Sequence, residues 1–548
     1  MDGVAAADTP TTPASPEHVG SVAGVGRGRG SAWAPGRVVG LAIGAVFAMP
    51  VVFVLWRTLR LGASLPDALA EVPAPLWRTI QLAVLVSVTA AIVGTGVAWL
   101  TTRTDLPFRR AWRIALVLPL ALPSFVGAAA FIAGLAPGGF IHDALDVIGI
   151  TPPRRFRGLG ASWLVMSAFT YPYVMLPVVA RMANLRTSLE ESGRLLGFSA
   201  TRTFLRVTLP QLRPAILGGT LLVFLYSVSE FGAVQLLGYD TLTRVIYSTR
   251  QTNRALSFAA ASVVLVLALG VVALERSQRG RSGADDRTAT SSPRSIRLGW
   301  RVVPAIAACL AVLSVGLLVP LLSLGTWAQR GLADGRIGFS ELVDPTISTA
   351  TVAVTAAVIA VLVVLPVAIG SIRRPHPSSQ IASVSVVVGF AIPGIVIALS
   401  LAVLTLNTPL LDRFYQSSGL LVLAYVIHFG SQALAGTETA VRAVPDHVRE
   451  SGALLEPNAA RRAWRIDWPL MRPGLLAAGG LVMLSTLKEL PITLLLSPIG
   501  FSTLATEIWS SYEEGFYAAT GLASLVLIAL SATLTWVLVL RRSEAVSS

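Results

Sequence analysis

Three ionisable side chains, Glu230, Glu489 and Lys488, lie inside long apolar stretches of the sequence. Charged groups in such stretches are costly, so they usually have a function or a partner. Two carboxylates that face a common cavity would suit a hard trivalent cation, because such cations prefer oxygen ligands. Alternatively, each carboxylate pairs locally, Glu489 with Lys488, and only fixes the packing of its helix. The residue types leave both interpretations open.

The sequence shows no nucleophile–base pair, metal-ligand cluster or phosphate-binding loop. Lys488 is the only lysine, and it lies in Thr486-Leu487-Lys488-Glu489, so the chain has no Gly-Lys-Ser/Thr loop to hold nucleotide phosphates. A single cysteine, Cys309, forms neither an internal disulfide nor a thiolate metal cluster. We therefore predict no catalytic residues, no metal site and no cofactor bound by this chain. If ATP drives its activity, a separate subunit hydrolyses it.

The composition indicates that lipid is the solvent of this chain. Hydrophobic residues make up 54% of the 548 residues, charged residues only 13%, and the mean hydropathy is +0.70. A soluble domain has about 25% charged residues. The net charge of +14 would suit nucleic acid, but the arginines fall between apolar runs and form no single basic face. We therefore expect a lipid bilayer, and no nucleic acid, as a partner.

Stretches long enough to cross a bilayer, about 20 apolar residues each, occur twelve times. This predicts an all-α polytopic membrane protein, with about twelve transmembrane helices arranged as two parallel six-helix repeats. The expected spans lie near 38–56, 79–101, 114–135, 160–182, 214–237, 257–275, 302–324, 347–370, 381–404, 418–440, 473–497 and 518–540.

Charge and composition divide the chain into four parts. Residues 1–36 are rich in Gly, Pro, Ala and Ser and are predicted to be a disordered cytoplasmic leader. Residues 37–276 form a first half, 277–301 an arginine-rich cytoplasmic linker, and 302–541 a second half. Positive charge collects in cytoplasmic loops, so we expect both termini on the cytoplasmic side of the cell membrane.

The two halves are internal repeats. Glu191-Ser192-Gly193 corresponds to Glu450-Ser451-Gly452, and the same spacing relates Pro210 to Pro469 and Glu230 to Glu489. Pro123 and Pro393 also correspond, at a slightly larger spacing, and we expect each to kink its span.

A segment between the fourth and fifth spans of each half has a recognisable spacing. In the first half it contains Glu191, Gly193, Gly197 and Pro210, and in the second half Glu450, Gly452 and Pro469. This spacing resembles the EAA loop of ABC importer permeases. The resemblance implies that these seven residues couple the chain to an ABC ATPase subunit, present in two copies.

The residues themselves suit a docking element. Gly197 would permit a turn between two short helices, and Pro210 would end the second one. The apolar side chains Leu195, Leu196, Phe198 and Phe204 could enter a groove on a soluble partner. The alternative is an ordinary amphipathic helix at the membrane surface. In the second copy Glu456-Pro457 replaces Gly197-Phe198, so the turn there must be built differently.

The segments around the two buried glutamates resemble the fifth span of ferric-iron importer permeases. They read Ser229-Glu230-Phe231-Gly232 and Lys488-Glu489-Leu490-Pro491, and the similarity covers about residues 38–540. The resemblance implies a permease that receives its solute, most simply ferric iron, from an extracytoplasmic solute-binding protein. Glu230, Glu489 and Lys488 would then line the translocation path. Thiamine and phosphonate permeases are related alternatives.

A secondary transporter is the main competing interpretation, because two parallel six-span halves also describe the major facilitator architecture. The Glu-Gly-Pro spacing in both halves opposes it. So does the loop after the second span, which lacks the glycines of a facilitator signature.

Overall fold

The computed structural model describes residues 34–152, 155–183, 185, 192–193, 195–279 and 296–535, and these are almost wholly helical. Within these ranges the β pairing consists of one isolated bridge, between Thr104 and Ile296. The described part contains ten helices long and apolar enough to cross a membrane, or twelve if two bent helix pairs each count as one span. The predicted all-α membrane fold of about twelve spans is confirmed. The predicted leader and linker fall largely outside the described residues.

The first half contains the helices up to α14. They are α1 (Ala34–Leu59), α2 (Leu65–Ala70), α3 (Pro73–Arg103), α4 (Arg109–Ala115), η2 (Leu118–Ala121), α5 (Ser124–Leu135), α6 (Phe140–Val147), α7 (Leu159–Thr170), α8 (Pro172–Ala183), α10 (Ala200–Thr203), η3 (Phe204–Thr208), α11 (Leu209–Ser229), α12 (Gly232–Leu236), α13 (Leu242–Thr249) and α14 (Arg254–Arg279).

The second half repeats this order. Its helices are α15 (Val302–Leu313), η5 (Ser314–Leu318), α16 (Val319–Ala333), α17 (Val343–Arg373), α18 (Pro377–Ala391), α19 (Gly394–Leu406), α20 (Ser418–Arg442), α21 (Asp446–Leu455), α22 (Ala459–Arg462), η8 (Ala463–Asp467), α23 (Trp468–Leu487), α24 (Pro491–Leu496), α25 (Leu504–Glu513) and α26 (Tyr517–Thr535).

The third span of each half is broken, where the sequence suggested only a kink. The two segments of the span meet at 92° in the first half and at 105° in the second. The break occurs at Pro123 and at Pro393, and the residues before them, Leu122 and Ile392, are extended. A proline pushes the preceding residue out of the helical region, so the helix must stop there and start again.

The fifth span of each half begins and ends earlier than expected. α11 ends at Ser229 and α23 at Leu487, so the predicted spans 214–237 and 473–497 are each interrupted. Pro210 does not end a helix, because it is the second residue of α11. A π-helical turn, η3 or η8, directly precedes each of these helices. Pro210 and Pro469, near the starts of α11 and α23, have no N–H to donate to the carbonyl four residues earlier. The wider π-helical turn accommodates them.

The first span of each half packs on the other half. α1 contacts α17, α18 and α19 of the second half, together with α14 of its own. In the same way α16 contacts α5 and α6 of the first half, together with α26 of its own. The two halves therefore exchange their first spans and hold each other together on both flanks.

Small residues allow the close approach of α1 to α18. A β-carbon at Gly44 would lie 3.0 Å from the Cα atom of Ala382, and one at Gly40 3.9 Å from its Cβ atom. Phe47, fully buried, packs where Gly389 and Gly430 leave room for its ring. Helices in lipid associate through such close packing, because their apolar side chains are no better solvated by protein than by lipid tails.

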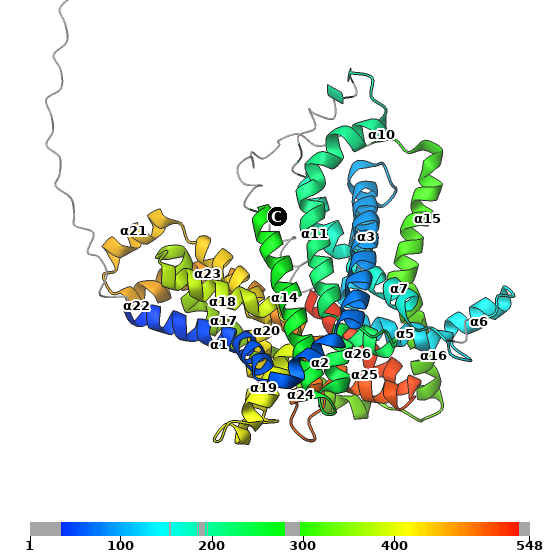
Figure 1. Ribbon diagram of the computed structural model, residues 1–548. Helices are drawn as coiled ribbons and strands as arrows, with labels where there is room; N and C mark the ends of the chain where they lie inside the picture. Colours follow the sequence, from blue (N-terminus) through cyan, green and yellow to red (C-terminus); the bar gives the residue numbers. More distant parts are fainter. Residues whose placement is uncertain are drawn as a thin grey trace, which may run out of the picture.

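The two halves separate toward one end of the molecule. In Figure 1 the end of the first half that carries α10 lies far from the end of the second half that carries α21 and α22. At the opposite end the halves touch, since the rings of Phe231 and Trp509 stack with their centroids 5.8 Å apart. This arrangement leaves the α10 and α21–α22 loops free of each other.

We predict that Gly44→Leu destabilises the protein, because a larger side chain would push α1 away from α18. Overpacking of this kind costs about 1–3 kcal/mol, so the thermal unfolding temperature of the purified protein in detergent should fall. Gly270→Leu is the matched control, since a β-carbon at Gly270 meets no atom within 4 Å. Equal unfolding temperatures for the two variants would show that the α1–α18 contact does not depend on Gly44.

Candidate functional site

The first loop turns at Gly197, as the sequence predicted. Gly197 has a φ of +80°, a conformation that side-chain-bearing residues rarely adopt. The backbone N–H of Phe198 donates to the carbonyl of Gly193 at 3.1 Å, which closes a Schellman turn with Gly197 at its left-handed position. Glu191 lies outside the described residues.

The second loop makes its turn without a left-handed residue. α21 ends at Leu455, and Glu456 is extended, with a φ of −133°. The side-chain oxygen of Asn458 then caps α22 by accepting from the N–H groups of Ala460 and Arg461, at 3.0 and 3.2 Å. The different turn expected from Glu456-Pro457 is confirmed, and Asn458 is the residue that builds it.

A buried glycine in each loop, Gly193 or Gly452, lies where the short helices of that loop meet. A β-carbon at Gly452 would lie 2.6 Å from the Cδ1 atom of Ile466, and one at Gly193 would contact Thr203 and Val207. Both glycines are buried, whereas Glu450 and Pro469 are exposed. The Glu-x-Gly pattern therefore has a packing reason at Gly452, where a β-carbon would clash, while Gly193 leaves room for one, and the glutamate faces outward in the second loop.

Each loop ends its first helix with two exposed leucines at corresponding positions. Leu195 and Leu196 are 89% and 75% exposed, and Leu454 and Leu455 are 87% and 84% exposed. Apolar side chains this exposed mark an interaction surface when they recur in a group. Phe204 does not belong to it, because its ring packs on Trp99, which corrects the predicted docking set.

The second loop is tied to the end of α17 by a nearly buried ion pair. Arg373 Nη1 lies 3.0 Å from Asp467 Oδ2, and the two side chains are only 10% and 13% exposed. Arg449 of α21 lies beside this pair, and burial together with the charge of Arg373 lowers the pKa of its guanidinium. Thr208 stands at the place of Asp467 in the first half. The second loop therefore has an ionic anchor that Thr208 cannot provide.

The carboxylates of Glu230 and Glu489 cap the short helices that follow the broken fifth spans. Glu230 Oε1 accepts from the N–H of Ala233 at 2.9 Å, and both oxygens of Glu489 accept from the N–H of Ile492 at 3.0 Å. Both side chains are buried. These hydrogen bonds give both glutamates a local structural role as helix caps. Their place in a translocation path stays a prediction.

Threonine hydroxyls complete each break. Thr243 Oγ1 donates to the carbonyl of Glu230 at 2.5 Å, and Thr493 Oγ1 donates to the carbonyl of Glu489 at 3.0 Å. Sequence reasoning missed both residues. For Thr493 the only signal was a hydroxyl inside an apolar run four residues after Glu489, which is too common to be decisive, and Thr243 lies in a polar segment thirteen residues after Glu230.

Lys488 does not pair with Glu489. Its ammonium donates at 3.0 Å to the carbonyl of Leu120, at the end of η2 in the first half. Lys488 therefore joins the fifth span of one half to the broken third span of the other. Ser229 occupies the corresponding position in the first half.

The broken third span lies against the carboxylate in each half. A β-carbon at Gly394, the first residue of α19, would lie 2.7 Å from Glu489 Oε1. Ser124, the first residue of α5, accepts from the hydroxyl of Tyr226 at 3.1 Å, one turn before Glu230. Two helix breaks thus meet in each half, and the two meeting points adjoin, since a β-carbon at Gly232 would lie 3.4 Å from the Cδ2 atom of Leu490.

A family model described as the inner membrane component of binding-protein-dependent transport systems matches residues 90–279 and 363–543. Each match begins within the second span of one half, and contains one loop and one broken fifth span. The chain belongs to this family. It is therefore a multi-pass inner-membrane permease subunit of an ABC importer, with two family repeats in one chain.

Individual relatives include permeases for different solutes. The Fe(3+)-transport system permease protein FbpB 2 of Haemophilus influenzae is 26% identical over 503 residues, which are 90% of this chain and 95% of the relative. The molybdenum transport system permease protein ModB of Escherichia coli is 30% identical, over 36% of this chain and 91% of its own length. A sulfate permease protein, CysT of Salmonella typhimurium, is 31% identical over 28% of this chain and 55% of its own.

We predict that Gly197→Trp leaves this permease inserted in the membrane but abolishes co-purification with its ATPase subunit or the coupling of transport. A residue with a β-carbon pays about 1–2 kcal/mol in the left-handed conformation, so the Schellman turn should open and displace Leu195 and Leu196. Co-purification and uptake should both be measured on the variant at wild-type expression. Normal uptake by a stably expressed variant would contradict the prediction.

Glu456→Gly is the matched change in the other loop, and it should be tolerated. The backbone of Glu456 is extended, and among the described residues its side chain makes a 3.8 Å ion pair with Arg461 and a 3.3 Å contact with the N–H of Asn458. Equal sensitivity at positions 197 and 456 would show that the two loops contribute alike.

Proposed function

We propose that this permease imports ferric iron that is delivered by an extracytoplasmic solute-binding protein. The proposal rests on how much of this chain aligns with one relative. The Fe(3+) permease of Haemophilus influenzae aligns with nine-tenths of the chain, across both halves and the linker, whereas the molybdenum and sulfate permeases align with about a third of it.

The chemistry of the broken fifth spans supports a cationic cargo. Glu230 and Glu489 recur at corresponding places, each at the edge of a helix break that adjoins the other half. An ionised carboxylate has about four lone-pair sites, so a carboxylate that caps one helix keeps further capacity to accept. Oxygen ligands of this kind suit a hard trivalent cation in transit.

The energy for transport would come from a separate ATPase. In the proposed arrangement two ATPase subunits bind on the cytoplasmic side, one at each loop, and Leu195, Leu196, Leu454 and Leu455 enter their grooves. The exposed leucine pairs support this docking, because a soluble partner is the simplest cover for apolar groups on a membrane-surface loop. Both termini would then lie on the same cytoplasmic side.

The cargo can be tested by uptake into proteoliposomes. The permease is reconstituted with its ATPase, and the cognate binding protein is added outside together with radiolabelled ferric ion, molybdate, sulfate, thiamine or phosphonate. We expect ATP-dependent accumulation of iron alone. Accumulation of an oxyanion or of thiamine, without iron, would refute the iron assignment. Uptake that persists without the ATPase would refute the importer mechanism.

Glu230→Gln combined with Glu489→Gln should depress iron uptake while membrane insertion and ATPase docking stay intact. Glutamine keeps the size of the side chain and one acceptor oxygen for the cap, so a loss reports the charge more than the packing. Initial uptake rates and ATPase co-purification measure the two effects separately.

A control is needed for Lys488, whose ammonium could be affected by the neutral neighbour. Lys488→Met is therefore added to the double variant, which also removes its hydrogen bond to Leu120. If both proteins carry iron at the wild-type rate, Glu230 and Glu489 are packing elements and the cation-path hypothesis is wrong.

A further inference from the structure

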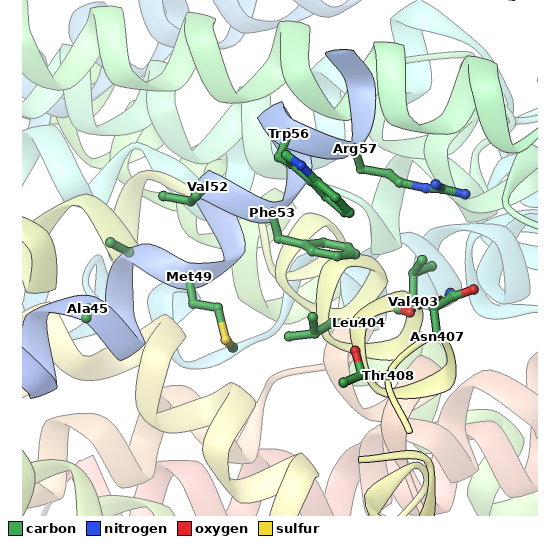
Figure 2. A pocket seen from close by; sticks show the side chains of 11 residues that line it. Ala45, Met49, Val52, Phe53, Trp56, Arg57, Val403, Leu404, Asn407 and Thr408 are labelled. Atoms are coloured by element: carbon green, nitrogen blue, oxygen red, sulfur yellow. Dashed lines mark hydrogen bonds between the residues drawn. The ribbon is translucent and has the colours of Figure 1, made fainter. Parts of the chain in front are cut away.

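An open groove of about 700 Å³ runs between α1 of the first half and α19 of the second. Figure 2 shows Phe53 and Trp56 of α1 above Val403 and Leu404 of α19, with Met49 further along the same helix. Its walls are mostly apolar. Because α1 has crossed to the other half, this groove lies on a contact between the halves and faces the lipid.

One end of the groove is polar and carries positive charge. Arg57, Asn407 and Thr408 line it there, and the guanidinium of Arg60 lies 4.8 Å above the ring of Trp56. The Nε atom of Arg57 is buried and has no hydrogen-bond partner among the described residues. A buried donor of a charged group is costly unless something accepts from it. No acidic side chain lines this groove, so the lining offers no anionic partner for the Arg57 guanidinium.

The length of the groove matches one leaflet of a bilayer. Its lining on α1 extends from Ala45 to Arg57, which is about 18 Å at 1.5 Å per residue. Half of a hydrocarbon core is about 15 Å thick. Arg57 stands in the last turn of α1, next to Trp56, and tryptophan is enriched at membrane–water interfaces.

We propose that this groove binds an anionic phospholipid. One acyl chain lies along Met49, Phe53 and Leu404, and the phosphate accepts hydrogen bonds from Arg57 and from the hydroxyl of Thr408. The lipid bridges the crossed-over α1 and α19, and the first residue of α19 contacts Glu489.

The proposal is tested by native mass spectrometry of the full chain, released from detergent micelles that contain phosphatidylglycerol or phosphatidylcholine with identical acyl chains. The wild type should retain one phosphatidylglycerol more tightly than phosphatidylcholine. Arg57→Gln should weaken phosphatidylglycerol retention by about tenfold, the order expected for loss of a charge-assisted hydrogen bond. Arg330→Gln should not, because that arginine, near the end of the other half's first span, already pairs with Asp143.

A second pair of variants tests the acyl chain. Ala45→Trp fills the groove and should reduce the retention of both lipids, whereas Val46→Trp, at the next and equally lipid-exposed position outside the groove, should not. Equal retention of phosphatidylglycerol by the wild type, Arg57→Gln and Ala45→Trp would overturn the proposal. A wild-type dimer that Ala45→Trp abolishes would also overturn the proposal, because the groove would then hold a second copy of the chain.

Discussion

Peptide groups that are cut off from water must find their hydrogen-bond partners inside the protein, and this constraint governs the centre of the molecule. Each half breaks two spans there, the third at a proline and the fifth at a glutamate. The glutamate carboxylates accept from the first free N–H groups beyond the break. The hydroxyls of Thr243 and Thr493 donate to the freed carbonyls. These four side chains thus satisfy backbone groups that the breaks leave without a helical partner.

The same breaks explain how two glutamates can lie buried so deep in the chain. A carboxylate that caps a helix is held by backbone dipoles and needs no cation beside it. Glu489 therefore does not need Lys488, which is free to reach Leu120 in the other half. The two halves are alike in the caps and differ at this bridge and at the Arg373–Asp467 anchor. The two halves are separate stretches of one chain, so corresponding positions can carry different residues.

Much of the architecture could be predicted from the sequence, since apolar length and repeated motifs are local signals. The number of spans, the two repeats and the turn at Gly197 are of this kind. The breaks were harder to predict, because Pro123 and Glu230 lie inside apolar runs that periodicity alone reads as continuous. The exchange of first spans left no signal along the chain except the spacing of Gly40 and Gly44. The partner of Lys488 was also missed, since it is a backbone carbonyl that no side-chain pattern reports.

The crossing of α1 has a consequence for how the protein is made. Gly44 is among the first membrane residues to leave the ribosome, but Ala382 follows roughly 340 residues later. At about 5–20 residues per second the glycine face of α1 waits on the order of 20–70 s for its partner. During that interval the helix stays in the bilayer, in contact with α14 once that span is made but with its glycine face uncovered. The order of synthesis therefore leaves this face of the first helix without its packing partner until the ninth span is inserted.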